Sequence, residues 1–282
     1  TVGKLLRYTM VHDFVVGDYM WTGIDYLGEA NWPQRSAGCG CLDTCGFEKD
    51  AFYFYRSVWN QKEKFAYLCP HWNLKLEKGT VLPVICYTNC EDAELFVNGR
   101  SFGMKSKGFP CYGMTERYGH FDRYRRPANT DDLFLSWDVP YEPGKIEVVG
   151  YHDGKEVCRY NVETTGEAAA IKLTVDKTSV DADGRSIVQA EVRIVDSEGR
   201  LVFDACPELY FTLEGDAEII GIDNGDPACH EQWKETKGRH AFNGMAYVVI
   251  RAGQSKGELT LTVQASGIDA AIGKASVTIS QK

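Results

Sequence analysis

The sequence has no run of apolar residues long enough to span a bilayer, and it shows no signal peptide. Basic residues are also few, since 31 Lys and Arg stand against 40 Asp and Glu, for a net charge of −9. Because nucleic-acid binding needs clustered cations against the phosphates, this balance argues against a nucleic-acid partner. The one basic run, at residues 123–126, is more typical of a solvated loop. We therefore expect neither nucleic acid nor a membrane as a partner.

Motifs for cofactors and metals are also missing. No glycine-rich phosphate loop, Ser-His-Asp arrangement or EF-hand ligand order rises above chance. Cys39, Cys41 and Cys45 have the spacing C-x-C-x3-C without a nearby histidine, which fits a structural zinc site poorly. We expect no cofactor and no metal, and a metal or redox role for this cysteine-rich loop stays open as a third functional hypothesis.

Ten cysteines are many for a chain of 282 residues, but too few for a disulfide scaffold. Cysteine is small and largely apolar, so we expect most of these thiols to fill part-buried positions. A Cys86–Cys90 or a Cys69–Cys111 disulfide is compatible with the sequence, but spacing alone cannot assign the connectivity.

Two stretches of short apolar runs separated by turn residues predict two β-sandwiches. The first covers residues 67–165 and contains Asn98-Gly99, a strong signal for a two-residue hairpin turn. The second covers residues 171–279, after a small and polar linker at residues 164–170. Each has about 100 residues, the usual size of an immunoglobulin-like sandwich. In the second sandwich we expect strands at residues 171–175, 187–195, 208–214, 247–251 and 258–265.

The first 65 residues follow a different pattern. Residues 14–27 form a short apolar run bounded by glycines, which predicts a fully buried parallel strand. Trp21 is followed by the carboxylates Asp25 and Glu29, an arrangement with which (β/α)8 barrels build sugar sites at the carboxyl ends of their strands. Apolar residues at helical spacing predict a helix over residues 51–59.

Residues 17–29, Gly-Asp-Tyr-Met-Trp-Thr-Gly-Ile-Asp-Tyr-Leu-Gly-Glu, resemble the eighth barrel strand of glycoside hydrolase family 2, the family of β-galactosidases and β-glucuronidases. The resemblance covers essentially the whole chain, through residues 32–36, 42–43, 46–50, 53–59, 70–73, 94–103, 137–145, 181–184, 221–227 and 242–244. It implies a mainly β fold in which two immunoglobulin-like β-sandwiches are preceded by a remnant, the last strand and helix, of a (β/α)8 barrel. The implied domains are residues 1–65, 66–165 and 166–282.

The resemblance also implies the chemistry. Retaining glycosidases use two carboxyl groups about 5 Å apart, one as nucleophile and one as acid and base. The two glutamates that do this in the family would lie upstream of Thr1, so we expect no catalytic residue in this chain and no activity from it alone. We expect a β-galactoside as the substrate of the intact enzyme. There, Asp25 and Glu29 would either bind sugar hydroxyls or support the residues that bind them. Trp21 would either stack on the sugar ring or pack in the barrel. In this chain alone we expect Trp21 to pack.

Other readings stay open. The chain could be a stand-alone, non-catalytic module that binds glycans or proteins through Trp233, Tyr112 and Tyr118, or through His230 with Trp233. An unpaired apolar strand is an aggregation template, so residues 1–65 should dock on the first sandwich or pair with a second copy as a homo-oligomer. The family's habit of degrading glycans implies a periplasmic or extracellular location in a bacterium.

Overall fold

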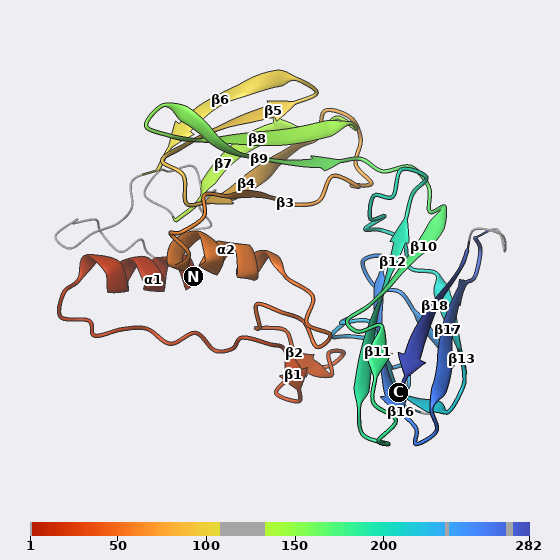
Figure 1. The fold of residues 1–282 in the computed structure, drawn as a ribbon. Coiled ribbons are helices and arrows are strands. Elements are labelled where there is room, and N and C mark those ends of the chain that lie inside the picture. Colours follow the sequence, from red (N-terminus) through yellow and green to blue (C-terminus); the bar gives the residue numbers. More distant parts are fainter. Residues whose placement is uncertain (1, 108–132, 235–236, 269–272) are drawn as a thin grey trace. The chain divides into compact units, whose positions relative to one another are not determined.

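The computed structural model describes residues 2–107, 133–234, 237–268 and 273–282. The chain is mainly β and divides into two compact units (Figure 1). Unit 1 contains Thr1–Gly23 and Glu48–Thr164, and unit 2 contains Ile24–Phe47 and Thr165–Lys282. The basic run at residues 123–126, Cys111, Tyr112 and Tyr118 lie outside the described residues.

The helices and strands of unit 1 are α1 (Val2–Val11), α2 (Asp50–Trp59), β3 (Ala66–Cys69), β4 (Val81–Thr88), β5 (Asp92–Val97), β6 (Arg100–Ser106), β7 (Leu135–Pro140), β8 (Lys145–His152) and β9 (Lys155–Glu163). Those of unit 2 are β1 (Tyr26–Leu27), β2 (Ser36–Ala37), β10 (Ala170–Val175), β11 (Ser179–Val180), β12 (Ile187–Val195), β13 (Glu208–Glu214), β14 (Ala217–Asp223), β15 (Gly238–His240), β16 (Met245–Ala252), β17 (Gly257–Ala265) and β18 (Lys274–Gln281).

Unit 1 is a β-sandwich with one sheet in the order β3-β4-β7 and another in the order β6-β5-β8-β9, all antiparallel. Alternate residues of the strands point inward, and Trp72, Leu95 and Val148 are fully buried between the sheets. The predicted hairpin at Asn98-Gly99 is confirmed, since β5 and β6 pair antiparallel and both turn residues have positive φ (49° and 79°), as a two-residue turn of this kind requires.

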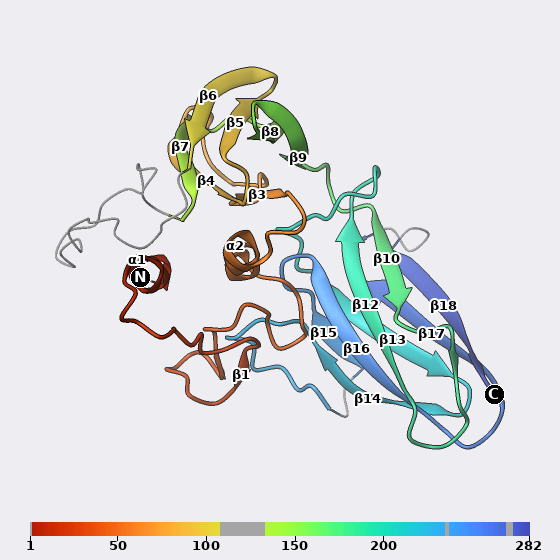
Figure 2. The ribbon, with the colours of Figure 1, turned by 60° about the vertical axis from the view of Figure 1, so that its left-hand side comes forward.

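Two helices pack together beside this sandwich. The helix predicted over residues 51–59 is confirmed as α2, and its Phe54 and Val58 share an apolar cluster with Leu6 of α1 and with Leu133. Tyr53 of α2 stacks on Tyr67 of β3, with ring centroids 3.6 Å apart. Figure 2 views both helices nearly along their axes, side by side. The helical part of residues 1–65 therefore docks on the first sandwich, one of the two outcomes expected from the sequence. Pairing with a second copy stays a prediction.

The prediction of a buried strand over residues 14–27 is wrong for this chain. Only Tyr26–Leu27 is a strand, paired with Ser36–Ala37, while Val16, Tyr19 and Trp21 are 106%, 95% and 72% exposed. A central barrel strand needs a strand on each side for its backbone hydrogen bonds. Among the described residues no strand pairs with residues 14–25 on both sides, so this stretch does not form a central strand.

Unit 2 is a second sandwich, with one sheet in the order β10-β12-β16-β14 and another in the order β11-β18-β17-β13-β15. All neighbours in these sheets are antiparallel except β11 and β18. The five strands expected here from the sequence are present as β10, β12, β13, β16 and β17, whereas β14 and β18 were not predicted. Val188, Leu209, Val248, Leu261 and Ile279 are completely buried in its core.

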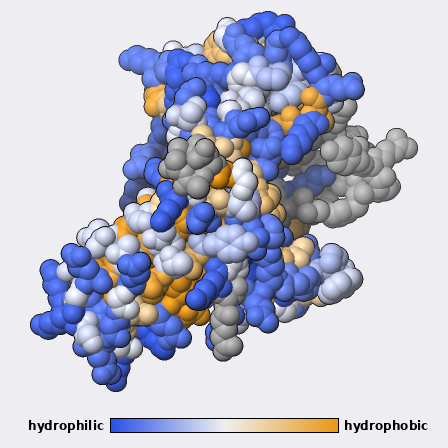
Figure 3. Space-filling view, turned by 90° about the vertical axis from the view of Figure 1, so that its right-hand side faces the viewer, coloured by the Kyte–Doolittle hydropathy of each residue, from blue (hydrophilic) through white to orange (hydrophobic). Residues whose placement is uncertain are grey.

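The fold class predicted from the sequence is thus confirmed: the chain is mainly β and contains two sandwiches. The predicted domain boundaries at residues 65 and 165 remain predictions. Figure 3 shows one face of the molecule, where hydrophilic residues cover most of the surface and an apolar band crosses part of it. No helix in the described part of the chain is long and apolar enough to cross a membrane.

The carboxylate of Asp196, at the turn after β12, gives unit 2 a defined pH dependence. Burial raises its pKa, but hydrogen bonds from Arg200 and from the backbone N–H groups of Gly166, Glu198 and Arg200 outweigh this and bring the pKa down to about 2. An aspartate in an unfolded chain titrates near pH 3.9. Because the folded pKa is depressed, Asp196 stabilises unit 2 above about pH 4, and this contribution is lost as the pH falls toward 2.

We therefore expect Asp196→Asn to lower the melting temperature of unit 2 at pH 6, with a gap to the wild type that narrows steadily between about pH 4 and pH 2. Thermal melts of the two proteins over this pH range measure the gap. Asp183→Asn is the control, because Asp183 caps an exposed turn and its loss should have a smaller effect. A difference in melting temperature that stays constant down to pH 2 would contradict the depressed pKa assigned to Asp196.

Candidate functional site

Residues 24–47, which the family resemblance links to the sugar site, belong to unit 2 and are held there by Asp223, the last residue of β14. Its Oδ1 accepts hydrogen bonds from Nη2 of Arg35 at 3.0 Å and from Nη2 of Arg239 at 2.6 Å, and its Oδ2 accepts one from Thr44 Oγ1 at 3.2 Å. The Arg239 side chain is fully buried and also donates to the carbonyl of Glu231 at 3.1 Å. One carboxylate thus pairs with two arginines and joins the loop to the sandwich.

A second carboxylate, Asp25, fixes the loop internally. Asp25 is only 6% exposed, its backbone N–H donates to the carbonyl of Leu42 at 2.9 Å, and its Oδ1 accepts from the backbone N–H of Gly40 at 2.6 Å. A Cβ at Gly40 would lie 2.4 Å from the Asp25 nitrogen and 2.6 Å from the Ile24 carbonyl carbon. The two halves of the loop therefore approach each other so closely that only glycine fits at residue 40.

Asp43 is a second carboxylate within the loop that fixes its shape. Its Oδ1 accepts hydrogen bonds from the backbone N–H groups of Cys45 at 2.8 Å and Phe47 at 2.9 Å. Burial raises the pKa of Asp43 more than these hydrogen bonds lower it, and the nearby charges of Asp25 and Asp223 raise it further. Asp223, Asp25 and Asp43 therefore shape and anchor the loop, and of these three only Asp25 was predicted from the sequence as a substrate-binding residue.

The outer surface of this loop carries an aromatic pair. Trp32 is 82% exposed, and its ring centroid lies 4.9 Å from that of His230 at an interplanar angle of 34°. His230 in turn hydrogen-bonds through Nε2 to the carbonyl of Pro33 at 2.6 Å. The sequence linked His230 with Trp233, but the structure brings it to Trp32. An exposed indole held from one side offers a flat apolar surface of the kind that packs on the C–H face of a sugar ring.

The three predicted substrate-binding residues fall in two different units. Trp21 belongs to unit 1, whereas Asp25 and Glu29 belong to unit 2. The expectation that Trp21 packs when the chain is alone is wrong, since its side chain is largely exposed. Glu29 is exposed, has a φ of 51° and accepts a hydrogen bond from the Tyr26 hydroxyl. The roles of Trp21, Asp25 and Glu29 toward a sugar stay predictions for the intact enzyme.

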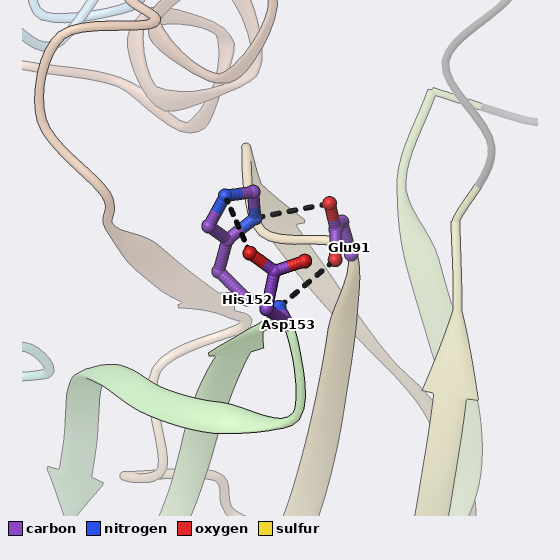
Figure 4. A group of neighbouring side chains, drawn as sticks. All are labelled: Glu91, His152 and Asp153. Carbon is purple, nitrogen blue, oxygen red and sulfur yellow. Dashed lines mark hydrogen bonds and ion pairs between the residues drawn. The ribbon is translucent and has the colours of Figure 1, made fainter.

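A separate cluster in unit 1 combines Glu91, His152 and Asp153 (Figure 4). His152 Nδ1 lies 3.0 Å from Glu91 Oε1, and the backbone N–H of Asp153 donates to Glu91 Oε2 at 3.1 Å. The three residues could each offer one metal-ligand atom, all within 4.8 Å of one another. However, Glu91 and Asp153 are exposed, and the contacts are those that hold the Asp153-Gly154 hairpin turn against the neighbouring strand. We therefore interpret the cluster as an ion pair that fastens this turn.

Comparison with known protein families supplies the context for these features. Residues 171–273, within unit 2, match the model of the glycoside hydrolase family 2 C-terminal domain 5, and residues 79–158, within unit 1, match a domain of unknown function, DUF4982. The chain is also 36% identical over 275 residues to the protein named Beta-galactosidase BoGH2A from Bacteroides ovatus, an alignment that covers 96% of this chain. The chain belongs to glycoside hydrolase family 2.

Other similar proteins are named as a beta-glucuronidase or, more generally, as a beta-glycosidase. A putative beta-glucuronidase of Formosa agariphila is 32% identical over 259 residues, covering 88% of the chain and 22% of that protein. The crystal structure of a beta-glycosidase from Bacteroides vulgatus superposes with a TM-score of 0.79 at 31% identity, over 94% of this chain and 30% of that one. The chain spans 29% of the length of BoGH2A, so it corresponds to the C-terminal portion of a family 2 protein.

Proposed function

We propose that this family 2 chain is the C-terminal part of a retaining β-galactosidase that hydrolyses terminal β-galactosides. The observation that supports this most is the 36% identity to a protein named as a β-galactosidase, over nearly the whole chain. Proteins named as β-glucuronidases reach 32% identity, so aryl β-glucuronides are the second candidate substrates.

In this proposal the chain is accessory to the chemistry. The nucleophile and the acid/base glutamates belong to preceding barrel strands of the intact enzyme, and the reaction passes through a covalent glycosyl intermediate. The two sandwiches brace the barrel. The loop of residues 24–47 offers Glu29 and the exposed Trp32 to the sugar, Asp25 acts behind them, and Trp21 stacks on the sugar ring in the intact barrel. A periplasmic or extracellular location and homo-oligomer contacts through residues 1–65 belong to the same proposal.

The test compares the intact enzyme with this chain alone. We expect the intact enzyme to release nitrophenol from an aryl β-galactoside much faster than from the matching β-glucuronide, and the purified 282-residue chain to release none above background. Turnover by the chain that persists in preparations from a host lacking its own β-galactosidase would contradict an accessory role. A preference of the intact enzyme for the glucuronide would replace the proposed substrate.

The exposed Trp32 also favours a second candidate, in which the isolated chain binds glycans without cleaving them. Calorimetry of the chain with galactose-terminated oligosaccharides tests this, with Trp32→Ala as the variant and Trp59→Ala, which removes another exposed indole, as its matched control. Binding that is lost in the first variant and kept in the second supports a binding module. Absence of binding by the wild type removes this candidate and leaves the accessory role.

A further inference from the structure

Two cysteines that are distant in sequence meet at the edge of the first sandwich. Cys90 lies in the turn between β4 and β5, and Cys158 lies in the edge strand β9. Their sulfur atoms are 3.5 Å apart, although 68 positions separate them in the chain. This pair is neither of the two pairs, Cys86–Cys90 and Cys69–Cys111, that the sequence suggested. Cys86 is a free and completely buried thiol.

The strand between them makes room for both sulfurs. Gly150 of β8 pairs directly with Cys158 of β9, and on its other side β8 pairs with β5, next to Cys90. A Cβ at Gly150 would lie 2.6 Å from the Cys158 sulfur and 2.7 Å from the Cys90 sulfur. A side chain at residue 150 would therefore occupy the space in which the two sulfurs meet.

The turn that carries Cys90 is held firmly. The Cys90 backbone N–H donates to Thr88 Oγ1 at 3.0 Å, and Thr88 Oγ1 donates to the carbonyl of Phe65 at 2.7 Å. Asn89 of the same turn accepts a hydrogen bond from the backbone N–H of Phe65 at 3.0 Å through Oδ1. The Cys90 sulfur thus stays beside Cys158, and a covalent bond requires the sulfurs to close from 3.5 Å to about 2.05 Å.

The surroundings of the pair also favour thiolate chemistry. A hydrogen bond from the Cys158 thiol lowers the pKa of Cys90, against the effect of burial, with the Thr88 hydroxyl and the charges of Lys64 and Lys107 acting in the same direction. The pKa of Cys158 is correspondingly raised. By contrast, burial raises the pKa of Cys86 to about 12 and also raises that of Cys69. The thiolate is the reactive form of cysteine, so this pair differs from Cys86 and Cys69 in its pKa. Cys90 is itself only 2% exposed, whereas Cys158 is half-buried in the edge strand, so Cys158 is the sulfur of the pair that a small disulfide can reach.

We propose that Cys90 and Cys158 form a reversible disulfide by exchange with small disulfides such as oxidised glutathione. The thiolate of the pair attacks one sulfur of oxidised glutathione and releases one glutathione thiolate, which leaves a mixed disulfide on the protein. The remaining cysteine loses its proton and attacks the protein sulfur of that mixed disulfide, releasing the second glutathione. The two cysteines lose two protons and two electrons in total, and one oxidised glutathione becomes two reduced ones.

The bond would tie the edge strand β9 to the turn before β5. This strand is the last of unit 1, and among the described residues its sheet neighbour is β8, on one side. Cross-linking residues far apart in sequence restricts the unfolded chain, so the oxidised form should unfold at a higher temperature than the reduced form. The pair would thereby couple the stability of the first sandwich to the redox state of its surroundings.

The test uses the full chain in glutathione buffers of graded redox potential, followed by alkylation of free thiols, intact mass and peptide mapping. We expect a product that carries two alkyl groups fewer than the reduced and alkylated chain, with linked peptides containing Cys90 and Cys158, and a melting temperature that returns to the reduced value on adding dithiothreitol. Cys158→Ser should abolish both changes, whereas Cys206→Ser, which removes an exposed thiol, should leave them intact.

Mapping of the wild type makes the result independent of how well any variant folds. Linkage of other cysteines, or stable glutathione adducts on Cys90 or Cys158 without a link between them, would overturn the proposal. The proposal would also be overturned if Cys90 and Cys158 were both still free for alkylation after exposure to oxidised glutathione. The exposed Cys39 and Cys206 must have reacted with the glutathione in the same sample for this result to count.

Discussion

Replacing Asp223 with alanine is expected to destabilise unit 2 by about 3–5 kcal/mol, because it leaves the buried guanidinium of Arg239 without its counter-charge. The Arg239 side chain is completely inaccessible, and Asp223 is the carboxylate that contacts it, at 2.6 Å. The same substitution removes the partners of Arg35 and Thr44, so residues 24–47 should also detach from the sandwich.

Two measurements separate these effects. Thermal melts should show unit 2 of Asp223→Ala unfolding roughly 10 °C or more below the wild type, and hydrogen exchange should show lost protection at the amides of residues 25, 28 and 35, whose N–H groups are bonded to other backbone carbonyls. Glu218→Ala is the matched control, since Glu218 also belongs to β14 and pairs with Arg251, but with both side chains exposed. Such surface pairs contribute at most about 1 kcal/mol. Equal losses in the two variants would contradict the role given to Asp223.

The sandwiches could be predicted because their strands carry local information. Residues 187–195 and 208–214 alternate between inward apolar and outward polar side chains, and the strands β12 and β13 have these limits in the structure. The two-residue turn at Asn98-Gly99 was equally readable, since it depends on a backbone conformation that few residues adopt. Strand β14 was missed because its residues, Ala-Glu-Ile-Ile-Gly-Ile-Asp, run across a β-bulge that breaks the alternation.

The first 65 residues could not be predicted in the same way, because their structure depends on partners rather than on pattern. The apolar run at residues 14–27 was read as a buried strand, and the helix α1 over Val2–Val11 was not expected. Leu6 and Met10 of α1 lie one turn apart and face the cluster formed with α2, a contact that the sequence of α1 alone does not reveal.

For the candidate site, too, the sequence indicated residue types but not burial or long-range contacts. Asp25 and Glu29 were selected by residue type and by position after the apolar run, but sequence gives no burial, and the structure shows one of them enclosed and the other exposed. Trp32 was not predicted as a site residue; it lies in residues 32–36, which were noted only for their resemblance to the family. Its contact with His230 joins residues 198 positions apart, which no local signal could indicate.

Substituting Gly40 tests whether the position of Asp25 matters to the enzyme. In Gly40→Ala the new methyl group would meet backbone atoms of Ile24 and Asp25 at 2.6 Å and 2.4 Å, and also Oδ1 of Asp25 at 2.7 Å. Backbone atoms cannot turn away as a flexible side chain can, so the backbone at Ile24 and Asp25 must shift. Overpacking of this kind costs about 1–3 kcal/mol, and the hydrogen bond from the Gly40 N–H to Asp25 should lengthen or break.

Gly38→Ala is the control within the same loop, because a Cβ at residue 38 would meet no atom within 4 Å. In the intact enzyme we expect Gly40→Ala to lower kcat/KM for an aryl β-galactoside by about tenfold or more, since a displacement of about 1 Å near a sugar subsite has effects of this order. Gly38→Ala should stay near the wild type in both activity and melting temperature. A Gly40→Ala enzyme that is destabilised but fully active would show that Asp25 shapes its loop without positioning the substrate, and that the carboxylate contributes to the fold alone.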